Sequence, residues 1–288
     1  MSPRPLTPPS VSCRALVATA AGLALLSLAC GHAAEPTQIV LQNGRAIALT
    51  AVALQGDKFV LKIESSGFAA GTVIPMTSVD HVFGDKPEAT DQAIALLLTG
   101  MPAEAGKLLE PLLAAHKDTA KLPGNFWLEA ARAALVAKAL EGDASACDTL
   151  GKEISDATPA QGADPFVLLG KALQLPSSTK VSDREAALQE LTTDNLPADL
   201  GAFASFFRAT LLKKNQRDAA ALEAYLTVSC RFPAGGLVVN GVAQLRAAEI
   251  LTAKGRREEA LALIHSAIRN TKGTAAEAQA AKLLDNIK

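Results

Sequence analysis

The sequence has few aromatic side chains: its 288 residues include one Trp, one Tyr and nine Phe. Neither sign of charge dominates, because 28 basic residues stand against 29 acidic ones. This balance argues against a nucleic-acid-binding protein, which needs a surplus of basic side chains to neutralise phosphates. Alanine supplies much of the hydrophobic fraction of 49%, and β-branched runs are few. The composition therefore predicts a mainly helical chain.

Familiar catalytic motifs are also missing. The sequence contains no GxSxG elbow, no phosphate-binding loop, no GxGxxG after a strand and no HExxH. Beyond residue 34 the histidines are His81, His116 and His265, and none has a second metal ligand at helical spacing. We therefore expect no catalytic residue, metal or cofactor. The alternative is a site that brings these histidines together from different structural units.

Residues 1–34 have the layout of a secretory signal peptide. Arg4 and Arg14 are the only charges before Glu35. Residues 15–29 are apolar or small throughout, and they are followed by the small residues Gly31, Ala33 and Ala34. The apolar segment is short for a membrane span, which needs about 20 residues. We expect export to a bacterial periplasm, with an uncleaved N-terminal anchor as the alternative.

Cys30 suggests a second way to process this segment. Leu26-Ser-Leu-Ala-Cys30 resembles the signal of a bacterial lipoprotein, although Ser27 stands where that signal usually has an aliphatic residue. Lipidation of Cys30 would give an outer-membrane-anchored lipoprotein. Contact with a membrane is expected only through this anchor.

Residues 37–84 alternate with a period near two, which is typical of β-strands. Asn43-Gly44 and Gly56-Asp57 predict turns, and a change of apolar phase near Thr50-Ala51 predicts a bulge or bend. Pro75 confines its strand to an edge or an end. The expected strands span 38–42, 45–54, 58–63, 72–76 and 78–83. Their order resembles that of SH3-like and Sm-like small barrels, which implies a β-barrel-like module.

Beyond residue 86 only helical periodicity is present, and it contains an internal repeat. Pairs of alanines lie twelve residues apart in four places: Ala93 and Ala105, Ala134 and Ala146, Ala209 and Ala221, Ala248 and Ala260. Small residues at this spacing fit where two antiparallel helices approach most closely. A fifth, irregular hairpin is expected over 166–173 and 184–191, and a capping helix over 274–287.

These alanine pairs, together with the turn Gly255-Arg-Arg-Glu-Glu-Ala260, resemble the tetratricopeptide repeat (TPR) over residues 86–288. The resemblance implies an α+β, mainly α fold, in which a TPR-like α-solenoid superhelix follows the β module. It also places Cys147 and Cys230 two hairpins apart, about 20 Å, which is too far for a disulfide. We therefore expect two free, mostly buried thiols.

In this family the first helices of the hairpins line a groove that binds protein or peptide segments. The positions that correspond here are Phe203, Phe206, Thr210, Lys213, Lys214, Leu245, Glu249 and Thr252, with Arg208 nearby. The basic cluster around Lys213 and Lys214 suggests a clamp for an acidic or carboxylate-bearing segment. Lysines also complement the dipole at a helix end without any ligand, so that interpretation stays open.

We therefore expect an exported scaffold or adaptor that binds a protein or peptide of the cell envelope and has no catalytic activity. The alternative is a cell-wall polysaccharide-binding protein in which the β module binds and the solenoid is a spacer. That alternative needs an aromatic platform made from Phe59, Phe68 and Phe83. Trp127, the single tryptophan, is expected to pack against the preceding hairpin.

Overall fold

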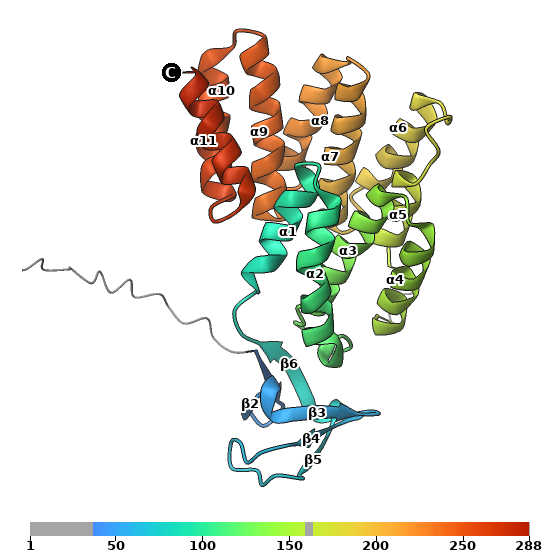
Figure 1. Cartoon of the computed structure of the whole chain (residues 1–288), viewed down its shortest axis with the longest axis vertical. Helices are drawn as coiled ribbons and strands as arrows, with labels where there is room; N and C mark the ends of the chain where they lie inside the picture. The colour runs from blue at the N-terminus through green and yellow to red at the C-terminus, as the bar shows by residue number, and fades with distance from the viewer. Residues whose placement is uncertain (1–36, 159–163, 288) are drawn as a thin grey trace, which may run out of the picture. The chain divides into compact units, whose positions relative to one another are not determined.

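Two small antiparallel sheets are followed by eleven α-helices in the part of the chain that the structure describes (Figure 1). This computed structural model describes residues 37–158 and 164–287. The expectation of a mainly helical chain with a small β portion near its start is confirmed. The predicted signal peptide and Cys30 lie outside the described residues.

The six strands form two three-stranded sheets. The first has the order β2-β1-β6 and the second the order β3-β4-β5, with all neighbours antiparallel. The strands are β1 (Gln38–Leu41), β2 (Ala46–Ala48), β3 (Val52–Gln55), β4 (Lys58–Leu61), β5 (Val73–Pro75) and β6 (Val79–Phe83). Pro75 ends β5, an edge strand, as predicted.

The long strand expected over 45–54 is bent in the middle. A 3₁₀ turn over Leu49–Ala51 separates β2 from β3, at the position where the apolar phase changes. The bend carries the chain from one sheet to the other, so the structure has six strands where the sequence predicted five. The strand expected over 58–63 ends at Leu61, and Ile63 beyond it is 59% exposed.

A residue from the helical region completes the core of the β module. Ile39, Ile47 and Phe59 are fully buried in this core, and Leu122 packs with them although it follows α2. The amide of Val82 donates to the carbonyl of Pro123 over 2.9 Å. The module and the helices are therefore joined by packing as well as by the chain.

The helices pair into five antiparallel hairpins and a final helix. Their bounds are α1 (Glu88–Leu98) and α2 (Pro102–His116), α3 (Trp127–Glu141) and α4 (Ala144–Ala157), α5 (Phe166–Leu173) and α6 (Val181–Gln189), α7 (Ala198–Lys214) and α8 (Asp218–Arg231), α9 (Leu237–Ala253) and α10 (Arg257–Asn270), and α11 (Ala275–Ile287). The hairpins and the last helix all lie in segments that the sequence predicted to be helical, although α6 begins three residues before its predicted start at residue 184 and ends two before its predicted end at 191.

The alanine pairs lie where the helices of a hairpin meet. Both alanines are fully buried in the first, fourth and fifth hairpins. In the second hairpin Ala134 is buried and Ala146 is half-buried. A larger side chain at the tight positions would force the two helices apart.

Helix α1 also packs against helices of later hairpins. It packs on α2 and α3, and it contacts α9 and α11 near the other end of the chain (Figure 1). Its side chains Ile94, Leu97 and Leu98 share one core with Phe203 and Phe206 of α7. Those two phenylalanines are therefore buried, although the sequence placed them on an open groove.

The two cysteines of the helical region differ in exposure. Both are free, as predicted, with Cys147 buried and Cys230 exposed. The expectation of two mostly buried thiols is therefore wrong for Cys230. Helix α8 packs on α7 and α9 through residues such as Ala221 and Val228, and Cys230 lies away from both contacts.

Candidate ligand pockets on the inner helical face

One face of α7 carries most of the candidate residues of the fourth hairpin. Phe203, Phe206, Thr210 and Lys214 recur every three or four residues, a spacing that aligns side chains along a helix. The two phenylalanines are buried, Thr210 is half-buried and Lys214 is exposed. This face therefore changes from apolar to basic toward the end of the helix.

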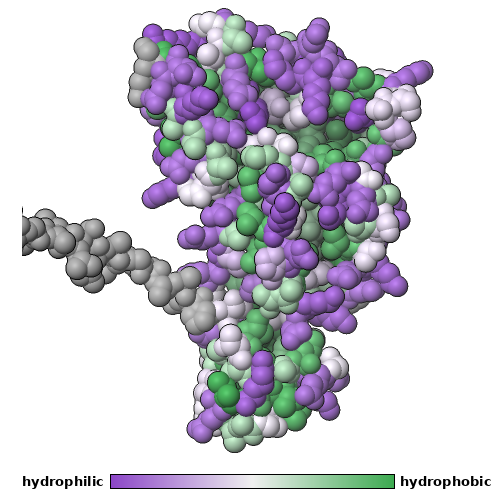
Figure 2. All heavy atoms as spheres, in the orientation of Figure 1, coloured by the Kyte–Doolittle hydropathy of each residue, from purple (hydrophilic) through white to green (hydrophobic). Residues whose placement is uncertain are grey.

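A pocket of about 170 Å³ lies at the basic end of this face. We call it the basic-rimmed pocket. Its apolar lining comes from five helices and consists of Leu97, Leu98, Leu140, Ala172, Leu173, Leu188, Phe206, Phe207 and Leu211, and the remaining lining residues are Gly100, Thr210, Arg184 and Lys214. In the view of Figure 1, hydrophobic side chains occupy a hollow beyond the α1–α2 turn, with hydrophilic side chains around it (Figure 2).

Arg184 and Lys214 are the only charged residues in the lining of this pocket. Neither makes an ion pair with any residue that the structure describes. The neighbouring cations are already neutralised. Lys213 forms an ion pair with Asp218 at 2.9 Å. The carboxylate of Glu185 forms ion pairs with Arg208 at 2.8 Å and with Arg217 at 2.6 Å.

Glu185 therefore has a structural role that the sequence did not predict. It connects α6 to α7 and to the turn that precedes α8. Burial raises the pKa of the Glu185 carboxyl, but the hydrogen bonds and charges of Arg217 and Arg208 outweigh burial and lower it. Glu185 stays ionised and leaves Arg184 and Lys214 as the free cations beside it.

A second pocket, of about 350 Å³, lies at the other end of the same face. We call it the acid-rich pocket. Phe166 and Phe203 belong to its apolar wall, and its charged residues are Lys86, Asp91, Glu129, Arg132 and Asp199. Lys86 binds Asp91 over 2.7 Å and Glu129 over 2.6 Å. Burial lowers the pKa of Lys86, but these two contacts outweigh burial and raise it above its usual value.

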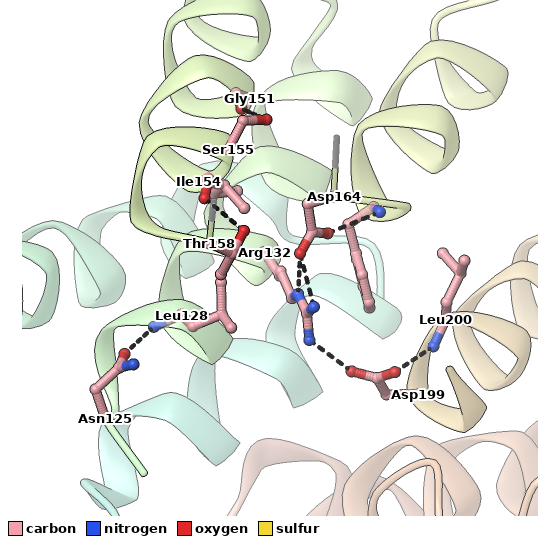
Figure 3. A network of polar contacts seen from close by, with 11 residues as sticks. Asn125, Leu128, Arg132, Gly151, Ile154, Ser155, Thr158, Asp164, Asp199 and Leu200 are labelled. Atoms are coloured by element: carbon pink, nitrogen blue, oxygen red, sulfur yellow. Dashed lines mark hydrogen bonds and ion pairs between the residues drawn. The ribbon is translucent and has the colours of Figure 1, made fainter. Parts of the chain in front are cut away.

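Arg132 organises the inner wall of the acid-rich pocket (Figure 3). Its guanidinium donates to the buried carboxylate of Asp164 and, over 3.1 Å, to Asp199 at the start of α7. It also lies 4.9 Å from the ring centroid of Phe166. Both cations of this pocket are thus paired, and its lining has one more carboxylate than cations.

A chain of phenylalanine rings separates the two pockets. Phe166 and Phe203 have ring centroids 5.7 Å apart, Phe203 and Phe207 are 6.3 Å apart, and Phe207 and Phe206 are 5.6 Å apart. The pockets are therefore two ends of one apolar surface, with opposite excess charge at the ends. Lys214 lies about 16 Å along the helix from Phe203, at 1.5 Å per residue.

The other candidate residues do not line either pocket. Leu245 is buried against Ala267 and Ala280, because α11 covers that part of α9, so its predicted place in the groove is wrong. Glu249 pairs with Arg246 over 2.7 Å, and the Thr252 hydroxyl donates to the carbonyl of Ala248 within its own helix. The sequence missed Arg184 and Arg132, because nothing in their local spacing relates them to α7.

The aromatic residues of the β module do not form a shared platform. Phe59 is fully buried and Phe68 is partly buried, with the Arg45 guanidinium 4.8 Å from its ring centroid. Phe83 is 50% exposed. Trp127 is buried and packs beside Leu113 of α2, so the prediction that it contacts the preceding hairpin is confirmed.

Three further observations bear on function. No group of three or more potential metal ligands occurs in residues 37–158 and 164–287. Within the same residues no helix is both long and apolar enough to cross a bilayer. No family model, no curated protein and no solved structure matches the chain. The resemblance to the tetratricopeptide repeat therefore stays a prediction.

Proposed function

We propose that this chain is an exported adaptor that binds a protein or peptide partner of the cell envelope through the inner face of a TPR-like superhelix. The observation that carries the proposal is the arrangement of the two pockets. They lie at opposite ends of one apolar face of α7, and one has free cations while the other has an excess of carboxylates. A partner segment with an apolar middle, an acidic end and a basic end complements this face.

The proposal includes the route of export. The layout of residues 1–34 supports a cleaved signal peptide and a periplasmic protein, and Cys30 supports a lipid-anchored form. Mass spectrometry of the N-terminus of the mature protein distinguishes the two. A chain that begins near Glu35 indicates cleavage after the small residues, and a lipidated Cys30 at the first position indicates a lipoprotein. An intact residue 1 contradicts both.

Photo-crosslinking in the source cells tests the partner. Leu140 is 37% exposed and lines the basic-rimmed pocket, whereas Leu168 is 51% exposed and lines neither pocket. A photoreactive amino acid at Leu140 is expected to capture one defined partner, and the same group at Leu168 is not. Equal capture at both positions, or recovery of wall polymer alone, contradicts the adaptor proposal.

The captured partner is then purified and its affinity measured directly. Lys214→Glu and Arg184→Glu place a negative charge at the basic-rimmed pocket, so each is expected to weaken binding about tenfold or more. Lys272→Glu makes the same change of charge at an exposed residue outside both pockets and is the matched control. An affinity that is the same in all three variants places the partner elsewhere.

A further inference from the structure

The side chains that line the interior of the basic-rimmed pocket have almost no capacity to hydrogen-bond a neutral ligand. Apart from its two cations, Thr210 is the only lining residue with a polar side chain. The Thr210 hydroxyl already donates to the carbonyl of Phe206 over 3.0 Å and lies 3.0 Å from the Tyr225 hydroxyl. The other lining side chains are aliphatic or aromatic.

An internal peptide segment is therefore a poor occupant of this interior. Each backbone amide and carbonyl that it buried there would lose its water without gaining a partner, which costs free energy. The partner proposed above can lie across the mouth of the pocket, where its backbone stays in water. The interior suits a ligand whose polar atoms are gathered at one end.

The positive charges at the mouth of the pocket determine the chemistry of the ligand's polar end. Arg184 and Lys214 have no carboxylate partner among the described residues, and they lie at the rim of an otherwise apolar lining. Two unpaired cations favour an anion, and a carboxylate matches the planar fork of an arginine.

The volume limits the size of the ligand. At about 170 Å³ the pocket is smaller than the roughly 300–1,000 Å³ of sites that enclose drug-sized molecules. We propose that the basic-rimmed pocket binds a small monocarboxylate with an apolar body, of the class of short- and medium-chain fatty acids. Its alkyl chain contacts Leu97, Leu188 and Phe206, and its carboxylate lies between Arg184 and Lys214.

Titration of the purified mature protein with octanoate tests this proposal without any partner. Octanol has the same alkyl chain without the charge, octylamine carries the opposite charge, and acetate has the carboxylate without the chain. Octanoate is expected to bind, and each of the other three is expected to bind about tenfold or more weakly. If octanol binds as tightly as octanoate, the cations do not take part and the proposal is wrong.

Variants locate the site. Lys214→Glu and Arg184→Glu are expected to reduce the affinity for octanoate about tenfold or more, while Lys272→Glu leaves it unchanged. All three residues are at least partly exposed, so the melting temperature of each variant is expected to stay near that of the parent protein. Equal loss in all three variants, or in none, overturns the assignment of octanoate to this pocket.

A tripeptide that ends in leucine, with a free or an amidated C-terminus, distinguishes the source of the carboxylate. If the free-acid peptide binds and octanoate does not, the small-ligand proposal is wrong and the pocket binds the C-terminus of a peptide chain.

A final measurement rests on the adaptor proposal. Octanoate should reduce crosslinking at Leu140, because ligand and partner share Arg184 and Lys214. Crosslinking that octanoate does not alter contradicts this shared use. Failure of the adaptor proposal alone leaves the octanoate titration unaffected.

Discussion

The guanidinium of Arg132 donates two hydrogen bonds to a single carboxylate oxygen of Asp164, from Nη2 over 2.7 Å and from Nε over 3.1 Å. The Asp164 side chain is fully buried, and its other oxygen accepts from the amide of Phe166. Because Arg132 also binds Asp199, this one side chain connects α3, the start of α5 and the start of α7 (Figure 3).

Loss of Arg132 is expected to destabilise the protein strongly. Arg132→Leu leaves the buried carboxylate of Asp164 without a counter-charge, and breaking a buried pair in this way costs about 3–5 kcal/mol. Urea unfolding measures the change in the free energy of unfolding. Adding Asp164→Asn to Arg132→Leu is expected to recover part of the loss, because no buried charge remains. A double variant as unstable as the single one would contradict this explanation.

Two helical glycines are expected to respond in opposite ways to substitution by alanine. A Cβ at Gly201 would lie 2.4 Å from a ring carbon of the buried Phe232, so Gly201→Ala should destabilise by about 1–3 kcal/mol. At Gly106 the nearest atom is 3.9 Å away, so Gly106→Ala should stabilise α2 by about 0.5–1 kcal/mol. Thermal unfolding of the two variants measures both effects. A Gly201→Ala variant as stable as the parent protein would contradict the packing at Gly201, and a destabilised Gly106→Ala variant would contradict the open space at Gly106.

The helical hairpins could be predicted because their signal is local. Alanines twelve residues apart mark close contact between neighbouring helices, and Ala209 and Ala221 are both fully buried. The bend after Ala48 could be predicted for the same reason, because the apolar phase changes within a few residues. The packing of α1 against α9 could not, since it depends on how the first and fifth hairpins are placed in the folded chain, which no local spacing encodes.

The two cysteines of the helical region are expected to react with thiol reagents at very different rates. Burial raises the pKa of the Cys147 thiol to about 11, so at pH 8 about one thiol in a thousand is ionised. Cys230 is exposed. Alkylation of the folded protein, followed by peptide mass spectrometry, should show Cys230 modified about ten times faster or more. The rates should converge in urea, and equal rates in the folded protein would contradict the burial of Cys147.

Mild acid is expected to destabilise the fold through His116. This histidine is buried, its Nδ1 has no partner among the described residues, and burial lowers its pKa below the usual 6.5. Between the lowered pKa of His116 in the folded protein and its usual pKa in the unfolded chain, the unfolded chain binds more protons than the folded one. The free energy of unfolding therefore falls as the pH drops below about 6.5.

His116→Gln removes this titration. Urea unfolding of the variant between pH 7 and pH 5 is expected to show a smaller loss of stability than the parent protein shows. The lowered pKa of Glu185 contributes mainly below its usual value of 4.5, so it does not obscure this comparison. A parent protein with constant stability over this range would contradict the burial of His116.

The candidate site was only partly predictable. Helical spacing correctly grouped Phe206, Thr210 and Lys214, because residues three and four apart share a face. Arg184 lines the same pocket but comes from a different hairpin. It has no ion-pair partner among the described residues because the neighbouring carboxylate of Glu185 pairs with Arg208 and Arg217. Which of several neighbouring cations is left unpaired is a property of the folded surface.

The place of Leu122 in the core of the β module sets an order of events during synthesis. The last strand of the module, β6, leaves the ribosome before the whole of the first helical hairpin, and Leu122 follows only after that hairpin. Until then the module lacks one of its buried side chains, and the amide of Val82 lacks its acceptor at Pro123. The N-terminal strands of this protein therefore remain an unfinished fold until the first helical hairpin and Leu122 are available to them.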